Sequence, residues 1–229
     1  MKRPIITIDG PSGSGKSTVA RLLARKLGLL YLDTGAMYRA VALKALRKEV
    51  PLADAEALTR LAERTRIRFR PAASGCNRVL LDGADVTAAI RRPAVSAAAS
   101  RVAVVPGVRR ALVREQRRLG RAGGLVAEGR DTGTVVFPRA SPKFFITSSA
   151  AERARRRHAQ LRASGHRIGR PQVLREIRAR DRRDRERRVA PLRQAPGAIR
   201  IDNTRLKPAE VFARLTDYVQ GANSRATGH

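Results

Sequence analysis

A glycine-rich stretch near the start of the chain has the spacing needed to bind a polyphosphate. Residues 10–17 read GPSGSGKS and satisfy the pattern G-x-x-x-x-G-K-[ST]. Backbone N–H groups of such a loop point into one concavity and bind phosphate oxygens. Lys16 would reach the β and γ phosphates of a nucleoside triphosphate, and the Ser17 hydroxyl would coordinate Mg²⁺. The candidate phosphate-binding residues are Gly10, Pro11, Ser12, Gly13, Ser14, Gly15, Lys16, Ser17 and Thr18.

A tripeptide that occurs twice suggests a different chemistry. Asp-Thr-Gly stands at residues 33–35 and again at residues 131–133. Aspartic proteases use two aspartates that share one proton. Those enzymes are built of β-strands, however, whereas stretches such as EALTRLAERTR have helical spacing. We therefore interpret the repetition as a coincidence and expect the two aspartates to form different walls of one nucleotide site.

The charge of the chain indicates an anionic partner. Its 229 residues contain 49 Lys plus Arg against 19 Asp plus Glu, a formal net charge of +30. Nucleic acid is one candidate, but only 3% of the residues are aromatic, which leaves few side chains on which bases could stack. A general bias toward arginine would give the same excess. Nucleic-acid binding is therefore the less favoured interpretation.

Several other functions find no support in the composition. Transmembrane segments need about 18 to 20 apolar residues, which no run approaches, and no signal segment opens the chain, so we expect a cytoplasmic protein. Cys76 is the single cysteine and has no partner for a disulfide. We expect it to be an ordinary loop or half-buried residue. The three histidines lack the spacing of a metal site.

Alternating strands and helices must position the candidate residues. Residues 4–9 form a β-branched apolar run that predicts a buried strand, and apolar residues recur at helical intervals after the glycine-rich loop. A second strand ends at Leu32, and its following turn and helix start carry Asp33, Thr34, Tyr38 and Arg39. Ligands bind beyond the carboxyl ends of parallel strands, so these side chains should face the phosphate-binding loop. We expect Asp33 to reach Mg²⁺ through a water molecule.

The remaining pattern predicts one α/β domain. Strands are expected at GLVAEGRD, at residues 143–149 and at AIRID, with arginine-rich helices between them and a closing helix around residues 211–218. This predicts a P-loop NTPase fold, three layers α/β/α with a central parallel sheet. Short alternating runs between Pro51 and Ile90 predict a small β-containing insertion. Residues after Gln220 read as a flexible tail.

One arginine-rich helix places a carboxylate among arginines. Arg180, Asp184 and Arg187 are spaced i, i+4 and i+7, and Arg183 is next to Asp184, so all four should share a face. Such a carboxylate can hold guanidinium groups in place for a phosphate or a sugar hydroxyl. A solvated, salt-bridged helix surface is the alternative that this segment alone leaves open.

Taken together, these motifs resemble bacterial cytidylate kinases, the CMP/dCMP kinase branch of the nucleoside monophosphate kinases. The resemblance runs through ITIDGPSGSGKST, LDTGAMYRA, VSAAASRVA, EGRDTGTVVFP, RDRRDRERRVAPL and IDNT, and covers residues 5–219. It implies a core of about residues 1–50 and 97–220, a CMP-binding insertion at about 51–96, a lid at about 156–171 and a flexible tail at 221–229. It also implies ATP as the phosphoryl donor, Mg²⁺, and CMP and dCMP as substrates of a monomeric enzyme.

The resemblance assigns roles to individual residues. The cytosine would be held by Ser100, Arg109 and Asp131, although Arg110 leaves open which arginine contacts the base. Relatives carry Ser where Thr34 stands or Asp where Glu128 stands, which keeps the donor or acceptor type. The sugar and phosphate of CMP would be met by Thr34, Tyr38, Arg39, Arg130, Arg180, Asp184 and Arg187. The cations that promote the reaction would be Lys16, Arg130, Arg153, Arg157, Arg180 and Arg187.

The expected chemistry needs no general base. The attacking group is a phosphate oxygen of CMP, which is largely ionised near neutral pH because its second pKa is about 6. Positioned cations would offset the repulsion between two polyanions. Two alternatives stay open: another P-loop kinase that uses Asp33 as a base toward a hydroxyl acceptor, and an NTP-dependent nucleic-acid binder. The sequence does not fix the preference among CMP, dCMP and UMP.

Overall fold

The computed structural model describes residues 3–70 and 77–226 of the chain. Its centre is a sheet in the order β2-β6-β1-β7-β8, in which every neighbouring pair is parallel. This confirms the predicted α/β class and the predicted strands. The five strands are β1 (Arg3–Asp9), β2 (Leu30–Asp33), β6 (Gly123–Gly129), β7 (Lys143–Thr147) and β8 (Ile199–Asp202).

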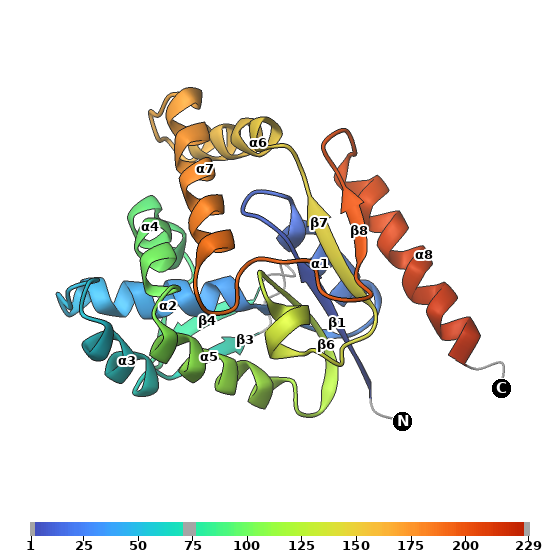
Figure 1. Ribbon diagram of the computed structural model, residues 1–229, viewed down its shortest axis with the longest axis horizontal. Coiled ribbons are helices and arrows are strands. Elements are labelled where there is room, and N and C mark those ends of the chain that lie inside the picture. Colours follow the sequence, from blue (N-terminus) through green and yellow to red (C-terminus); the bar gives the residue numbers. More distant parts are fainter. Residues whose placement is uncertain (1–2, 71–76, 227–229) are drawn as a thin grey trace.

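Helices cover both faces of this sheet, as Figure 1 shows. Successive strand residues point to opposite faces, so Val126 packs with α1 and α8 on one side while Leu125 and Ala127 pack with α2 and α5 on the other. Near-continuous apolar strands result, as expected for a sheet buried on both faces. These four helices are α1 (Lys16–Lys26), α2 (Thr34–Arg47), α5 (Pro106–Leu119) and α8 (Pro208–Ala226).

The segment between α2 and α5 contains the expected β-insertion. Strands β3 (Ile67–Arg70), β4 (Arg78–Leu81) and β5 (Ala84–Asp85) form a small antiparallel sheet. Ile67, Val79 and Leu81 of this sheet belong to the same apolar cluster as α2 and the main sheet. The Cys76 prediction lies outside the described residues. The helical parts of this segment are α3 (Ala55–Glu63), a 3₁₀ turn at Ala89–Arg91 and α4 (Pro93–Val102).

Two arginine-rich helices form an arm at the carboxyl edge of the sheet. They are α6 (Ala150–Ala163) and α7 (Arg170–Glu186), which pack against each other and lie at the upper left of β7 in Figure 1. The arm has its own small core of Ala154, Leu161, Val173 and Ile177. The proposed lid, residues 156–171, corresponds to the end of α6, the connection and the start of α7.

Two helix ends differ from the expectation. Helix α7 ends at Glu186, and Arg187 already has an extended backbone with φ −57° and ψ 135°. Arg187 therefore reaches its partners from beyond the helix and not from the helix face on which the i+7 spacing placed it. Helix α8 continues past Gln220 to Ala226. Among the described residues, no helix combines the length and apolar character required to span a membrane.

Candidate active site

A cleft of about 1700 Å³ opens where the strands of the main sheet end. Its walls come from the phosphate-binding loop, the start of α2, the turn after β6, and helices α4, α6 and α7. Five predicted site residues do not line it: Gly10, Pro11, Ser14, Arg109 and Arg153. The predicted residues that line the cleft are Ser12, Gly13, Gly15, Lys16, Ser17, Thr18, Asp33, Thr34, Tyr38, Arg39, Ser100, Arg130, Asp131, Arg157, Arg180, Asp184 and Arg187.

The phosphate-binding loop joins β1 to α1 in a conformation that requires glycine. Gly10 has φ +148°, and a Cβ there would lie 1.9 Å from the carbonyl oxygen of Ile146. Lys16 Nζ donates to the carbonyl oxygen of Pro11 at 2.7 Å and lies 3.3 Å from Ser14 Oγ. Burial, and then the charge of Arg130, lower the pKa of Lys16 to about 7. The Lys16 side chain thus folds back over its own loop, and no carboxylate of the described residues forms an ion pair with it.

The start of α2 is fixed by Asp33. One carboxylate oxygen accepts from the backbone N–H of Ala36 at 2.8 Å and caps the helix, while the other accepts from Arg39 at 2.7 Å. Thr34 Oγ1 donates to the carbonyl oxygen of Glu128 at 2.7 Å. Since both oxygens of Asp33 already have partners, this aspartate is poorly placed to act as a general base.

Oxygen atoms gather beside Lys16 in a way that suits a magnesium ion. Glu128 at the end of β6 accepts from Tyr31 Oη, and its pKa is raised by burial and by the negative charge of Asp33. Lys16 and a hydrogen bond from Ser17 offset part of this rise in the pKa of Glu128. Two mutually repelling carboxylates and a hydroxyl form the kind of oxygen set that Mg²⁺ prefers. The residues present therefore fit the ion.

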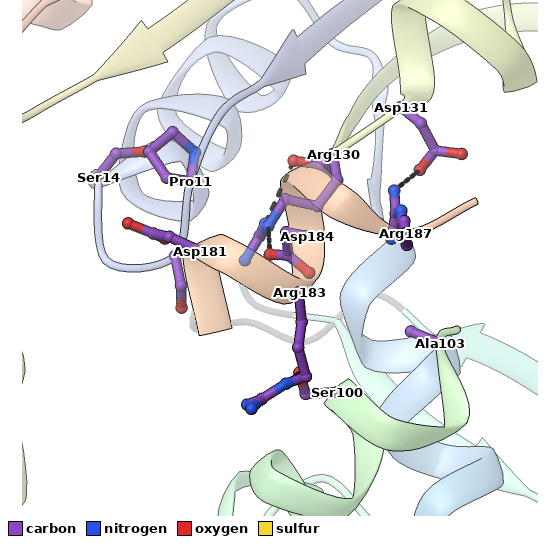
Figure 2. A network of polar contacts seen from close by, with 12 residues as sticks. Pro11, Ser14, Ser100, Ala103, Arg130, Asp131, Asp181, Arg183, Asp184 and Arg187 are labelled. Carbon is purple, nitrogen blue, oxygen red and sulfur yellow. Dashed lines mark hydrogen bonds and ion pairs between the residues drawn. The ribbon is translucent and has the colours of Figure 1, made fainter. Parts of the chain in front are cut away.

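The turn after β6 carries Arg130 and Asp131, which point to different partners. Arg130 Nε donates to Asp184 Oδ2 at 2.8 Å. Asp131 is paired with Arg109 and lies 3.5 Å from Arg187. Figure 2 shows the ion pairs Arg130–Asp184 and Asp131–Arg187 side by side. Asp184 lies on α7, and Arg187 lies just after the end of that helix. Asp33 pairs with Arg39 instead, so the two Asp-Thr-Gly aspartates share no proton and the protease hypothesis fails.

Tyr38 and Arg109 pack against each other next to Asp131. The Arg109 guanidinium lies over the Tyr38 ring, 5.4 Å from its centroid, and donates to the carbonyl oxygen of Ala103 at 3.2 Å. Burial raises the pKa of Tyr38 to about 12, so its hydroxyl stays protonated. Arg110 is exposed. Of the two neighbouring arginines, the one next to Asp131 is therefore Arg109.

Three arginines of the cleft have a buried N–H group without an acceptor or a charge that burial disfavours. The Nε atoms of Arg39 and Arg180 are buried and have no hydrogen-bond partner among the described residues. Burial, and then the charge of Arg130, lower the pKa of Arg180 to about 10. Burial also lowers the pKa of Arg157, and the charge of Arg39 adds to that effect. Guanidinium groups in this state are prepared to bind an anion.

Two predicted residues have contacts that the sequence did not indicate. Arg153 is buried and its donors are used by Asp181, by the carbonyl oxygen of Ser148 and by that of Ser12, so it connects the phosphate-binding loop to α7. Ser100 Oγ accepts from Arg183 Nε at 3.1 Å, which links α4 to α7 across the cleft (Figure 2).

Two functional positions were missed. Asn203, after β8, donates to the carbonyl oxygen of Ser14 at 2.7 Å and accepts from Arg156. Asp9, at the end of β1, accepts three hydrogen bonds from Thr132 and Gly133. Asp9 is the last residue of β1 and Asn203 the first residue after β8, so both lie at the carboxyl edge of the sheet. The signals in the sequence were this edge and the motifs ITIDGPSGSGKST and IDNT, in which neither residue was given a role.

Comparisons with known proteins agree on one family. The cytidylate kinase family profile matches residues 6–221. A cytidylate kinase from Pelotomaculum thermopropionicum is 56% identical over 212 residues, which cover 93% of each chain. One from Symbiobacterium thermophilum is 55% identical over 211 residues, covering 92% of this chain and 93% of the relative. A bifunctional pantoate ligase/cytidylate kinase from Synechococcus sp. (strain JA-3-3Ab) is 53% identical over 216 residues, which cover 93% of this chain but 40% of that protein.

Proposed function

The chain belongs to the cytidylate kinase family, and from this membership and the geometry of the cleft we infer that it transfers the γ-phosphoryl group of ATP to CMP or dCMP. The products are ADP and CDP or dCDP. One observation carries the inference most directly. The phosphate-binding loop lines the same cleft as Arg39, Arg157 and Arg180, whose guanidinium groups have a buried N–H without an acceptor among the described residues or a charge that burial disfavours. The cleft would therefore bind two anions, one at the loop and one at the arginines.

Different residues bind the phosphoryl donor, ATP, and the acceptor, CMP. Backbone N–H groups of the phosphate-binding loop hold the β and γ phosphates, and Lys16 turns from Pro11 toward them. Arg39, Arg130 and Arg180 bind the phosphate of CMP and offset the repulsion between the two anions. No residue has to remove a proton, because the attacking phosphate oxygen is already ionised near neutral pH.

Mg²⁺ would be held by Ser17 directly and by Asp33 and Glu128 directly or through water. When bound, it neutralises the phosphate charge that develops during the transfer. The raised pKa of Glu128 supports this assignment, because a cation between Glu128 and Asp33 would relieve their repulsion.

Cytosine selection is assigned to Asp131 with Arg109 and Ser100. An aspartate accepts from the exocyclic amine of cytosine, while an arginine and a serine donate to the ring nitrogen and carbonyl. In the free protein, Asp131 holds Arg109 in place and Ser100 is engaged by Arg183. The base would therefore replace the Arg183 contact at Ser100. Residues of a single chain line both the loop side and the arginine side of the cleft, so the proposed reaction needs no residue from a second subunit. We propose a monomeric enzyme of the cytoplasm.

An assay for ADP formation with ATP and Mg²⁺ tests this function. CMP and dCMP should be turned over best, UMP weakly, and AMP and shikimate not measurably. Turnover of shikimate or another hydroxyl acceptor in preference to CMP would support a different P-loop kinase. ATP hydrolysis stimulated by RNA or DNA, without transfer to CMP, would support the nucleic-acid binder that the charge alone suggests.

A further inference from the structure

Asp9 is a buried aspartate for which the phosphoryl transfer itself has no use. It is 2% exposed at the end of β1. Its Oδ1 accepts from the backbone N–H of Thr132 at 2.9 Å and from the Thr132 hydroxyl at 2.8 Å, and its Oδ2 accepts from the N–H of Gly133 at 2.7 Å. Every donor lies in the two residues that follow Asp131.

The position of Asp9 in the sheet places it between the phosphate-binding loop and the turn after β6. It precedes Gly10, the first residue of the phosphate-binding loop, and in the parallel pairing of β1 with β6 it stands opposite Gly129. The chain that leaves β6 lines the cleft with Arg130 and Asp131 and then meets the Asp9 carboxylate at Thr132 and Gly133. A single side chain ties the turn that carries Arg130 and Asp131 to the central strand.

The turn is shaped to fit this carboxylate. A Cβ on Gly133 would lie 2.8 Å from Thr7 Oγ1 and 3.4 Å from Asp9 Oδ2, so only glycine lets the backbone come so near. Gly133 belongs to a π-helical turn formed by Thr132–Val136. At the end of this turn, Arg117 donates to the carbonyl oxygens of Val135 and Val136. Asp9 and Arg117 thus fix the two ends of the turn.

We propose that Asp9 is a positioning residue for nucleobase selection, which holds the turn after β6 so that the Asp131 carboxylate faces the base. The inference rests on the proposed function. It explains why Thr and Gly follow Asp131: they supply the hydroxyl and the two N–H groups that Asp9 receives. Asp9 does not contact the substrate. Its effect passes through the backbone of residues 131–133 to the side chain of Asp131.

The substitution Asp9→Asn tests the proposal, because it keeps the shape and replaces one acceptor oxygen with an NH₂ group that faces an N–H donor. We expect kcat/KM for CMP to fall about ten- to hundredfold and the CMP-to-UMP ratio to fall about tenfold, while KM for ATP stays within about twofold. KM for ATP is spared because the carbonyl oxygens of the phosphate-binding loop accept hydrogen bonds from Lys16, Arg153 and Asn203, and Asp9 takes part in none of these bonds.

Matched variants separate positioning from folding. Asp217 is an exposed aspartate on α8 that does not line the cleft, so Asp217→Asn should leave the ratio unchanged. If Asp9→Asn does not fold, Thr132→Val should lower the ratio and Thr132→Ser should restore most of it. An unchanged ratio in Asp9→Asn or in Thr132→Val, or equal losses on CMP, UMP and ATP, overturns the inference. Absence of CMP turnover in the wild type overturns the proposed function instead.

Discussion

Arg153 and Asp181 form an ion pair with two parallel contacts, NH1 to Oδ1 at 3.0 Å and NH2 to Oδ2 at 2.6 Å. Both side chains are buried between α6 and α7. The same guanidinium donates to the carbonyl oxygens of Ser12 and Ser148 at 3.1 and 3.0 Å. It therefore fixes the distance between the phosphate-binding loop and the helix that carries Arg180.

Replacing this arginine should destabilise the protein strongly. Arg153→Met leaves Asp181 buried without a counter-charge, which costs about 3–5 kcal/mol. The thermal midpoint should fall on the order of 10 °C, measured by calorimetry. The double variant Arg153→Met/Asp181→Leu removes both charges and should recover most of the loss, but not the turnover, because the link to Ser12 is still missing. A single variant as stable as the wild type would contradict this account.

Arg180 should show the opposite effect on stability. Its guanidinium is buried beside Arg130, and the lowered pKa of about 10 means that its charge is disfavoured in the folded protein at neutral pH. Arg180→Met should raise the thermal midpoint about 2–4 °C, the shift that about 1 kcal/mol gives in a domain of this size. KM for CMP should rise at the same time. Arg178→Met, on the exposed side of α7, is the matched control. A lower midpoint in Arg180→Met than in Arg178→Met would refute the prediction.

The local part of this site was predictable from the sequence. The phosphate-binding loop lies between a strand and a helix that are neighbours in the chain, so spacing alone located Lys16 and Ser17. The apolar strands were equally clear because both faces of the sheet are buried. The carboxyl-edge rule then placed Asp33 and the turn after β6 next to that loop.

Long-range partners were not predictable in the same way. Asp9 meets Thr132 across 123 positions and Arg153 meets Ser12 across 141, and neither pairing leaves a periodic trace. The resemblance placed Arg153 among the cations that promote the reaction, whereas its donors are used inside the protein. Arg187 shows a second limit: helical spacing identified a useful residue, but the helix ends before it.

The pKa of Lys16 predicts proton uptake on ATP binding. In the free protein, burial and Arg130 lower that pKa to about 7, below the ordinary value of lysine. Bound phosphates favour the charged form, so binding above pH 7 should take up a proton and weaken as the pH rises, while below pH 7 the lysine is already charged. Calorimetry in buffers of different ionisation enthalpy measures this uptake. Lys16→Ala should abolish it and lower turnover by about two orders of magnitude or more with the fold preserved. Equal uptake by both proteins, or near-normal turnover of the variant, would rule out this role.

Asp131 should control the choice of base more than the affinity for ATP. Its carboxylate accepts from the amine of cytosine, whereas uracil presents a carbonyl oxygen at that position, which an asparagine amide can meet as a donor. Asp131→Asn should therefore lower kcat/KM for CMP about tenfold or more relative to UMP, with KM for ATP little changed. Arg109→Met should act in the same direction, because Arg109 pairs with Asp131, while Arg110→Met is the exposed control. Steady-state kinetics with both nucleotides decide the matter, since equal losses on CMP and UMP would show that Asp131 supports the fold of the site and does not read the base.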